Sequence, residues 1–364
     1  MKILHLSSES SWRGGEQQIA YLISELQQKN IDNLVACRAG SAFEKHCQHN
    51  NIPHFSLPFQ GSFDLSTAWT IRTLCKQKSI DLVHIHSAKS HSLAVLSHVM
   101  GSRTPLILSR RVDFPIRSNF LTQWKYNHPA VRRIVCVSEA IEQIVRKNVR
   151  RPERCATVHS GIDTNRIGRA AGFLKAQYQL PKGVLLIGNT SALAGHKDYY
   201  TFIRTAAVFR KYKIPARFFI IGDGPEREAL QAYIQEKSLT DYIFMTGFLS
   251  NIGEVLPELD IFLMTSEMEG LGTSVLDAFA ASVPVVATRA GGIPEMVIHQ
   301  ETGMLAEVKD PQTLARHLKT LSENPPLAQK LAENATLLLH QHFTKEKMAA
   351  GTLDIYQEIM AGQY

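Results

Sequence analysis

The strongest candidates for a functional site lie between Ser266 and Glu295, where the sequence reads SEMEGLGTSVLDAFAASVPVVATRAGGIPE. The apolar run from Leu259 to Met264 predicts a buried strand before it, and Thr273 and Ser274 open a predicted alanine-rich helix. A strand, a glycine-bearing turn and a helix N-terminus together form an anion site, because unpaired backbone N–H groups and the helix dipole point toward the ligand. The sequence therefore predicts a phosphate site here.

Two carboxylates flank this predicted phosphate site. Glu269 comes just before the helix, and Asp277 follows after seven intervening residues. Carboxylates accept paired hydrogen bonds from neighbouring hydroxyls such as those of a ribose or hexose. Asp277 could instead stabilise the first turn of the helix, and Glu269 could be an ordinary loop carboxylate. Their position beside the glycine loop favours ligand binding, and a phosphate site beside hydroxyl-binding carboxylates suggests a sugar nucleotide.

Two further motifs belong to the same half of the chain. Lys197 follows the apolar run VLLIGNTS at the start of a predicted helix, where a mobile cation is well placed to neutralise a diphosphate. As a merely solvated lysine it would oppose the helix dipole. GDGPE, from Gly222 to Glu226, predicts a strand-to-helix turn with Pro225 at the first helical position, and we interpret it as mainly structural.

Gly14, Gly15 and Glu16 follow the first predicted strand and open the first predicted helix. Glycines at this point let the backbone approach a phosphate closely, and Glu16 could bind an acceptor hydroxyl. A glycine turn without function is the alternative. The segment is not GxGxxG and no acidic residue follows in the dinucleotide pattern, so it does not favour a nicotinamide cofactor.

Histidine and arginine pairs end two other predicted strands. His84 and His86 lie on the same face of a strand, but the sequence offers no further metal ligands, so packing or acceptor contacts are favoured over a metal site. Arg110 and Arg111 are candidates for binding an anion. The stretch from Phe114 to His128 mixes aromatic with basic residues, which is typical both of a surface that meets a membrane and of a core helix with basic flanks.

Composition excludes several classes of protein. Five scattered cysteines without a CxxC pair predict a reducing cytoplasm, no disulfide framework and no zinc site. No apolar run reaches the roughly 20 residues of a membrane helix, and Lys2 leads into ILHLSS too directly for a signal peptide. The chain lacks both a DxD motif and GxxxxGK[ST], so we expect no metal, no cofactor and no ordinary NTPase.

Charge is unevenly distributed along the chain. Residues 1–164 carry 21 Lys or Arg against 12 Asp or Glu, a net charge of +9, whereas residues 165–364 carry 19 against 21, a net charge of −2. A basic half suggests an anionic partner such as a phosphorylated glycan, an acidic lipid headgroup or nucleic acid. A solvated basic surface without a dedicated partner is the alternative.

Short apolar runs alternate with helical patterns throughout, which predicts two α/β domains with mostly parallel, doubly wound sheets. The predicted strands of the first half are Ile3–Ser7, Leu34–Arg38, His54–Leu57, Leu82–His86, Leu106–Ser109, Ile134–Ser138 and Thr157–His159. Those of the second half are Val184–Ile187, Phe218–Ile221, Ile243–Thr246, Ile261–Met264, Val283–Ala287 and Met304–Ala306. Gly161–Gly172 is the predicted linker, and helices are predicted over 198–212, 225–238, 273–281, 312–323 and throughout the tail from Pro326.

Over essentially the whole chain these features resemble glycosyltransferase family 4, whose members are retaining enzymes of the GT-B fold. The segments that carry the resemblance are GGE after the first strand, VSEAI at 137–141, HSGID at 159–163, Lys197, GDGPE, EGLGTSVLDAFAASVPVVAT and GGIPE. The resemblance implies two Rossmann-like domains that face a cleft, with a C-terminal helix that crosses back to the first domain. The expected boundaries are 1–164 for the acceptor-side domain, 165–345 for the donor domain and 346–364 for the helix.

The resemblance also implies roles for individual residues. Glu269 would contact the donor sugar and Lys197 would neutralise the leaving diphosphate, so these two are the catalytic candidates. The implied donor-binding residues are Gly15, Phe248, Gly270, Leu271, Gly272, Thr273 and Asp277, with Asp277 at the ribose and the backbone near Phe248 at the nucleobase. The acceptor-side candidates are Glu16, His86, Arg110, Arg111 and Ser138.

The sequence departs from the family pattern at three places. Asp277 stands where glutamate is usual, which shortens its reach by one methylene. Ala192 stands five positions before Lys197 where an arginine is usual, which leaves the diphosphate one cation poorer. The histidine often found after the fourth main N-terminal strand has no counterpart in LSRRVDF, where Arg110 or Arg111 could compensate electrostatically.

These observations predict a cytoplasmic, metal-independent, retaining glycosyltransferase that moves a sugar from a nucleotide-diphosphate donor, its co-substrate, to a glycan or lipid-linked glycan acceptor. Lipopolysaccharide or polysaccharide biosynthesis is the expected setting, with a peripheral contact at the inner membrane surface as a further expectation. The alternatives are a GT-B nucleotide-sugar epimerase and a catalytically inactive sugar-nucleotide-binding module. A nucleic-acid-binding protein is suggested by charge alone, so we expect no nucleic-acid partner.

Overall fold

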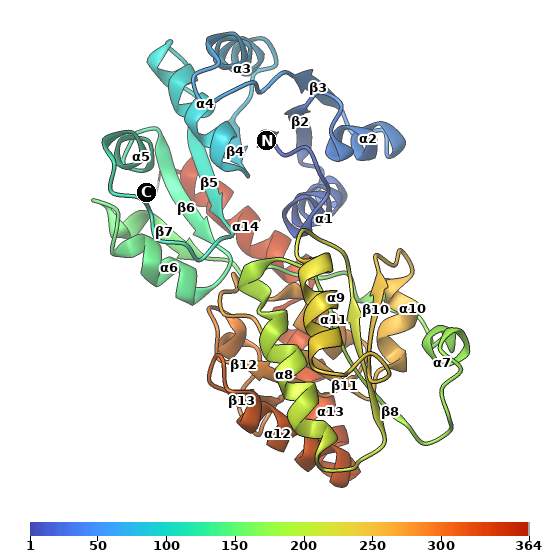
Figure 1. Cartoon of the computed structure of the whole chain (residues 1–364). Helices are drawn as coiled ribbons and strands as arrows, with labels where there is room; N and C mark the ends of the chain where they lie inside the picture. Colours follow the sequence, from blue (N-terminus) through green and yellow to red (C-terminus); the bar gives the residue numbers. More distant parts are fainter. Residues whose placement is uncertain (363–364) are drawn as a thin grey trace. The chain divides into compact units, whose positions relative to one another are not determined.

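A computed structural model describes residues 1–362 as two compact units (Figure 1). Unit 1 comprises Met1–Gly161 together with the chain from Lys345 on, and unit 2 comprises Ile162–Thr344. The two doubly wound, Rossmann-like units expected from the sequence are confirmed, and both sheets are parallel. The five cysteines are free and buried.

The sheet of unit 1 has the strand order β3-β2-β1-β4-β5-β6-β7. Its strands are β1 (Lys2–Ser7), β2 (Asp32–Arg38), β3 (His54–Leu57), β4 (Leu82–Ile85), β5 (Leu106–Arg110), β6 (Val131–Cys136) and β7 (Cys155–Thr157). Its helices are α1 (Gly14–Gln28), α2 (Ala42–His49), α3 (Leu65–Gln77), α4 (Ala88–Val99), α5 (Phe120–Tyr126), α6 (Glu139–Arg146), the short η1 (Pro152–Arg154) and α14 (Lys345–Met360).

The sheet of unit 2 has the strand order β10-β9-β8-β11-β12-β13. Its strands are β8 (Leu185–Thr190), β9 (Ala216–Ile221), β10 (Ile243–Gly247), β11 (Ile261–Met264), β12 (Val285–Thr288) and β13 (Met304–Ala306). Its helices are α7 (Phe173–Gln177), α8 (Tyr199–Arg210), α9 (Arg227–Glu236), α10 (Ile252–Val255), α11 (Thr273–Ala280), α12 (Pro311–Glu323) and α13 (Pro325–His342), with the short turns η2 (Thr164–Arg166), η3 (Gly195–Lys197), η4 (Leu256–Glu258) and η5 (Ile293–Glu295).

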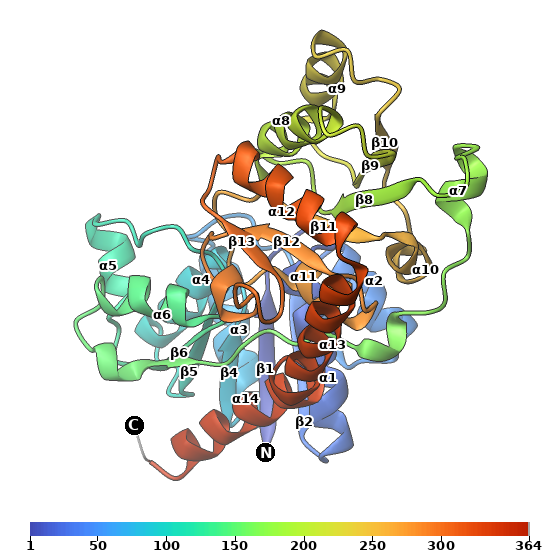
Figure 2. The same ribbon diagram turned by 90° about the horizontal axis from the view of Figure 1, so that it is seen from below.

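The last helix belongs to the core of unit 1. Helices α1 and α14 lie side by side (Figure 2) and cover the sheet face that carries Ile3, Leu82 and Ile107. Tyr356 of α14 is fully buried there, and its hydroxyl lies 2.5 Å from Nδ1 of His84. A parallel sheet needs both faces covered, so α14 supplies a cover that the first 161 residues lack.

The core of unit 2 is rich in aromatic rings. Phe202 and Phe209 of α8 both pack edge-to-face on Phe218 of β9, with centroids 5.7 Å and 5.8 Å apart. Helix α12 packs beside α8, whereas α11 packs beside α13. Unit 2 therefore holds its strands, and the loops that leave them, on a well-packed frame.

Two local predictions were wrong. The tail is not helical throughout, because Ile162 pairs with Thr344 and its N–H donates to the Phe343 carbonyl, which ends α13 and separates it from α14. Pro225 precedes α9, which begins at Arg227, and the N–H of Glu226 between them donates to the Leu193 carbonyl outside the helix.

The predicted linker, Gly161–Gly172, begins where the two units divide, and most of it packs with unit 2. It contains η2, and the N–H of Gly168 donates to the Gly253 carbonyl at 3.0 Å. A Cβ at Gly253 would lie 2.1 Å from the Arg166 carbonyl oxygen, so only glycine allows this close approach. The first residues of unit 2 are thus held against α10.

Replacing Tyr356 with Phe should lower the free energy of unfolding of unit 1 by about 1–3 kcal/mol, because a buried nitrogen of His84 loses its partner. The three tryptophans, Trp12, Trp69 and Trp124, all belong to unit 1, so urea unfolding followed by tryptophan fluorescence reports this unit. The control is Glu358→Gln, which breaks the partly exposed pair with Arg133 and should cost less than about 1 kcal/mol. An equal loss of unfolding free energy in both variants would contradict the stabilising role of the bond between Tyr356 and His84.

Candidate functional site

In unit 2 the strand order reverses between β8 and β11, and ligands of doubly wound sheets bind outside the carboxyl ends of the strands at such a point. Lys197 follows β8 in η3, and Glu269 follows β11 in the loop that leads to α11. The two predicted catalytic residues therefore lie on the two strands that flank the reversal.

Lys197 and Glu269 form an ion pair, with Nζ and Oε2 2.5 Å apart. Their side chains are only 15% and 13% exposed, and the hydroxyl of Ser266 donates to the same carboxylate oxygen at 3.2 Å. Removing either partner of such a little-exposed pair would leave a charge without compensation. The sequence predicted both residues but not that they would touch.

The backbone that carries Glu269 is held by Gly291 and Gly292. Gly291 has a φ of +49°, and a Cβ there would lie 1.8 Å from the Glu269 carbonyl oxygen, so no side chain fits. The N–H of Gly292 donates to that same carbonyl at 3.1 Å. From the other side, the N–H of Glu267 donates to the His196 carbonyl next to Lys197. GGIPE is thus the support of the Glu269 loop.

Gly270, Leu271, Gly272 and Thr273 form the entry to α11. Gly272 is the N-cap with a φ of +95°, and no side chain of the described residues caps this helix. The N–H groups of its first turn are therefore not satisfied by a cap and can serve an anion. Leu271 is buried and contributes packing.

Asp277 lies in the second turn of α11 rather than the first, and it is buried. One of its oxygens pairs with Arg166 of η2, and the other, Oδ1, is buried without a hydrogen-bond partner. Burial raises the pKa of this carboxyl, and Arg166 opposes the rise. An acceptor without a donor suits a ligand hydroxyl. Sequence reasoning missed Arg166, because nothing local marks it as the partner.

The GDGPE turn is structural, as predicted. A Cβ at Gly222 would lie 2.0 Å from the Ser191 carbonyl oxygen, and one at Gly224 would lie 2.5 Å from that of Leu193. These contacts hold the segment after β8 that carries Ala192 and leads to Lys197. Phe248, the residue expected near a nucleobase, follows β10 and is 78% exposed.

Unit 1 reverses its strand order between β1 and β4, and three histidines lie there on one sheet face. His5, omitted from the sequence-based candidates, joins His84 and His86, and each ring offers a nitrogen within 4.8 Å of the others. All six ring nitrogens nevertheless have hydrogen-bond partners. The His5 ring bonds to His86 and to Asn33, and the His84 ring bonds to Tyr356 and to Ser109. The second nitrogen of His86 accepts from Arg111. The cluster is therefore a satisfied hydrogen-bond network beside a cation rather than a metal site.

Arg111 lies above this network, with a guanidinium nitrogen 3.2 Å from Nδ1 of His86. Its Nε is buried without a partner, and burial lowers its pKa to about 10, although the carboxylate of Glu16 opposes that shift. Glu16 itself accepts from the Arg13 N–H at 3.1 Å, which helps cap α1. A Cβ at Gly15 would lie 3.9 Å from Arg111 Cδ, whereas one at Gly14 would meet open space. Packing thus does not require glycine at position 14.

The side chains of two acceptor-side candidates already make hydrogen bonds within unit 1. Ser138 is fully buried, and its hydroxyl accepts from the Ile141 N–H at 3.2 Å as the N-cap of α6, so the structure assigns it to capping rather than to an acceptor. Arg110 donates to the hydroxyl of Tyr126 and to the Phe114 carbonyl, which ties the segment before and through α5 to the end of β5.

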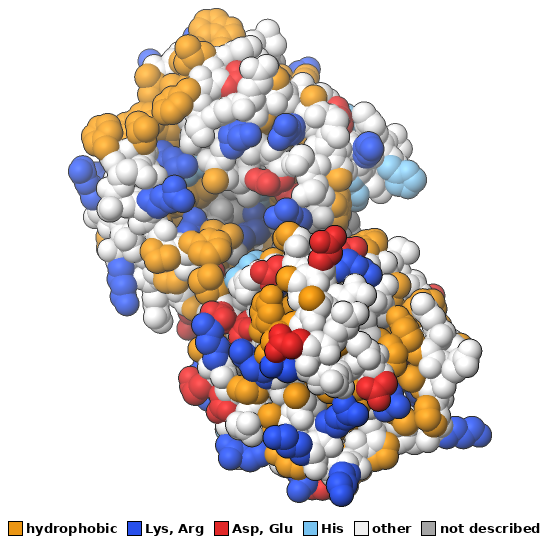
Figure 3. Space-filling model, viewed as in Figure 1, with side chains coloured by type: hydrophobic (Ala, Val, Ile, Leu, Met, Phe, Trp, Pro, Cys, Tyr) orange, Lys and Arg blue, Asp and Glu red, His pale blue; other side chains and the backbone are white. Residues whose placement is uncertain are grey.

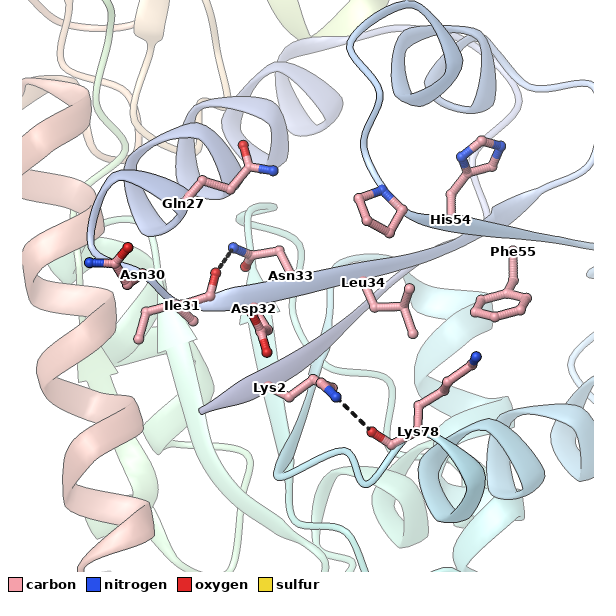
Figure 4. A pocket seen from close by; sticks show the side chains of 11 residues that line it. Lys2, Gln27, Asn30, Ile31, Asp32, Asn33, Leu34, His54, Phe55 and Lys78 are labelled. Carbon is pink, nitrogen blue, oxygen red and sulfur yellow. Dashed lines mark hydrogen bonds between the residues drawn. The ribbon is translucent and has the colours of Figure 1, made fainter.

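A separate hollow lies elsewhere in unit 1. It has a volume of about 660 Å³ and is lined by the starts of β1, β2 and β3 and by the ends of α1 and α3 (Figure 4). Lys2 and Lys78 border it, and Asn33 turns its amide toward the Ile31 carbonyl. Because it opens at the amino ends of the strands, away from the strand reversal, we do not assign it to the site.

Solved structures confirm the fold. The chain matches a structure of Alr3699/HepE of Anabaena in complex with UDP, with a TM-score of 0.86, 21% identity, and coverage of 98% of this chain and 100% of that one. Both units thus have the architecture of the GT-B glycosyltransferases.

Sequence comparisons then give the family. A model described as Glycosyltransferase Family 4 matches residues 12–166, and one described as Glycosyl transferases group 1 matches residues 172–337. The chain belongs to the family 4 glycosyltransferases. It is 24% identical to N-acetyl-alpha-D-glucosaminyl L-malate synthase of Bacillus anthracis over 82% of this chain and 80% of that protein. It is 21% identical to the lipopolysaccharide core biosynthesis glycosyltransferase LpsD of Rhizobium meliloti over 99% of each chain.

Replacing Gly291 with Ala should displace the loop that carries Glu269, because the new Cβ would overlap a carbonyl oxygen. We expect a loss of stability well above the roughly 1 kcal/mol of an ordinary strained glycine replacement, together with loss of nucleotide binding. Gly183→Ala is the matched control, since Gly183 also has a positive φ, of +80°, but open space around it. Thermal unfolding with and without nucleotide measures both effects, and similar behaviour of the two variants would contradict the assignment.

Unit 1 should lose stability in mild acid. Burial lowers the pKa of His5 to about 4 and that of His91 to about 3, and lowers the pKa values of His84 and His86 well below 6.5. Between pH 6.5 and 4 the unfolded chain therefore binds more protons than the folded one. The contribution of the neutral histidines to the free energy of unfolding is fully present above pH 6.5. As the pH is lowered below that value, the free energy of unfolding falls by up to about 1.4 kcal/mol per pH unit for each histidine.

Urea unfolding at pH 7, 6 and 5, followed by tryptophan fluorescence, measures this slope. His91→Asn should make this slope smaller by the contribution of one proton. A slope of zero between pH 7 and 5 would contradict the prediction, because the folded and unfolded chains would then bind the same number of protons.

Proposed function

We propose that this protein is a retaining, metal-independent glycosyltransferase that moves a sugar from a uridine-diphosphate donor to a glycan or lipid-linked glycan acceptor. The observation that carries the proposal is the Lys197–Glu269 pair at the strand reversal of unit 2, directly before the uncapped N-terminus of α11. Family membership supplies the class of reaction.

The donor residues divide the work between them. The diphosphate binds to the N–H groups at Gly272 and Thr273, and Lys197 neutralises the charge that develops on the leaving phosphate. When the diphosphate draws Lys197 away, Glu269 becomes free to accept a hydroxyl of the sugar. Asp277 accepts a ribose hydroxyl at Oδ1, the oxygen that lacks a partner, while Arg166 holds the other oxygen. The UDP in the HepE structure supports uridine as the base.

The resemblance to family 4 implies a reaction on one face of the sugar, and this division of roles is compatible with it. The acceptor hydroxyl attacks from the side on which the diphosphate leaves, its proton passes to the departing phosphate oxygen, and the anomeric configuration is retained. Lys197 and the α11 N–H groups then act by positioning and charge stabilisation, and no side chain of the protein forms a bond to the sugar.

The acceptor side is proposed from unit 1. Arg111 keeps a cation beside the strand reversal, with its Nε unsatisfied, and Gly15 lies next to its side chain. An anionic acceptor suits this charge. The similarity to LpsD over nearly all of both chains supports lipopolysaccharide or another surface polysaccharide as the setting. Within residues 1–362 no helix combines the length and apolar character needed to cross a bilayer.

A nucleotide thermal-shift panel tests the donor. Among UDP, GDP, ADP, CMP and dTDP, UDP should stabilise the protein most, by about 2.7 kcal/mol at a concentration one hundred times its Kd. Asp277→Asn should weaken UDP binding by about 1–3 kcal/mol, because the amide is a poorer acceptor and loses its pairing with Arg166. Equal stabilisation by all five nucleotides would remove the basis of the donor assignment.

Two substitutions test the chemistry. Lys197→Ala and Glu269→Gln should each abolish sugar transfer, because one removes the cation that stabilises the leaving group and the other the carboxylate that receives the sugar. Lys309→Ala is the control, since Lys309 forms an exposed pair with Glu267 in the same unit and should leave transfer unchanged. Normal rates in Lys197→Ala would exclude the proposed role.

Product analysis separates the alternatives. An epimerase would consume donor without acceptor and release nucleotide and an inverted sugar, whereas an inactive binding module would bind UDP without any turnover. The exposed Ala192, in place of a second cation, is the feature that favours the inactive module. Transfer to an acceptor with retained configuration excludes both.

A further inference from the structure

Unit 1 exposes a group of large apolar side chains where a monomeric surface would normally bury them. We call Phe63, Leu65, Trp69, Phe120, Leu121 and Trp124 the aromatic patch. Phe120 is 79% exposed, Phe63 68% and Leu65 60%. Leu65 and Trp69 are four residues apart on α3, and Phe120 and Trp124 are four apart on α5, so each helix turns one side outward.

The two parts of the patch meet. Phe63, Leu121 and Trp124 line one shallow hollow of about 40 Å³, with Leu96 of α4 between them. Lys125 holds α5 to α4 through the Ala88 carbonyl and the hydroxyl of Ser92. The space-filling view shows hydrophobic side chains gathered along this edge of unit 1, with lysines and arginines next to them (Figure 3).

The charge around the patch is mainly positive, although Asp64 stands between Phe63 and Leu65. From His86 to Lys125 the chain carries six Lys or Arg and a single acid, Asp113. Arg72 lies 4.6 Å from the ring of Trp69, so a cation also accompanies the α3 part. Exposed tryptophan and phenylalanine among cations are typical of surfaces that enter the headgroup region of an anionic bilayer.

The patch is also connected to the acceptor side of unit 1. Arg110 reaches from the end of β5 to the Tyr126 hydroxyl at 3.0 Å and to the Phe114 carbonyl, so it joins both ends of the segment that carries α5. Arg111, the next residue, lies beside His86 at the strand reversal. A partner surface that binds the aromatic patch would therefore contact the segment that carries α5. The same segment begins next to Arg110 and Arg111, the candidate acceptor groups.

We propose that the aromatic patch is a docking surface for an anionic lipid bilayer, in which the aromatic rings enter the interface and the surrounding cations bind lipid phosphates. This deepens the proposed function, on which it rests for the acceptor, because it holds the enzyme at the surface where a lipid-linked glycan is found. The occupant is the bilayer and not a protein, since the predominantly positive charge complements anionic headgroups.

Vesicle sedimentation of the full chain tests the proposal. The protein should bind vesicles of phosphatidylethanolamine with phosphatidylglycerol at least about tenfold more strongly than vesicles of phosphatidylcholine, and raising the salt should weaken binding. The triple variant F63S/F120S/L121S should lose at least about tenfold in partitioning. Arg117→Glu, at an exposed position in the basic segment, should lose about tenfold on the anionic vesicles alone.

Leu337→Ser is the matched control, because Leu337 is 61% exposed on α13 of unit 2, and it should bind vesicles as the unchanged protein does. A UDP-induced thermal shift in the triple variant shows that it is folded. Glu269→Gln should still bind vesicles, so a failure of the transfer chemistry is distinguishable from a failure of docking.

Three outcomes would overturn the proposal. One is equal binding to neutral and anionic vesicles, and another is unchanged binding by the triple variant. The third is self-association of the unchanged protein in sedimentation velocity that the triple variant abolishes without any vesicle binding by either, which would assign the patch to a second copy of the chain.

Discussion

The short ion pair between Lys197 and Glu269 is the interaction on which the rest of unit 2 depends. Two charges with so little exposure are stable only together, because the surroundings solvate a single one poorly. The loop after β11 must therefore follow one path, and Gly291 permits that path by leaving room for the Glu269 carbonyl. In the proposed function, an anion that attracts Lys197 releases the Glu269 carboxylate for a hydroxyl of the sugar.

At its own strand reversal, unit 1 has a cation over neutral side chains instead of an ion pair. Neutral histidines lie beneath Arg111, and each ring nitrogen already has a partner, so the cation rests on a layer that can neither take up charge easily nor rearrange without losing hydrogen bonds. Such a layer keeps the guanidinium in place. The positive charge that the sequence shows in this half of the chain therefore includes a residue held rigidly as well as residues on the surface.

Much of the fold was predictable because each strand is a short apolar run: His54–Leu57, Ile261–Met264 and Met304–Ala306 have the predicted bounds. The break near Phe343 was not, because it is made by a bridge to Ile162, which is distant in sequence. Residue types at the site were predictable, but partners were not. Alternation along a strand shows which side chains share a face, and only the strand order could bring His5 beside His84 or Arg166 to Asp277.

The bridge between Ile162 and Thr344 has a consequence for how the protein is made. It brings the first and last residues of unit 2 together, so this unit is an insertion within unit 1. On the ribosome, unit 2 can close as soon as Thr344 has emerged, whereas the sheet of unit 1, begun first, must wait for α14 to complete the cover that α1 begins. The part synthesised first is therefore completed last.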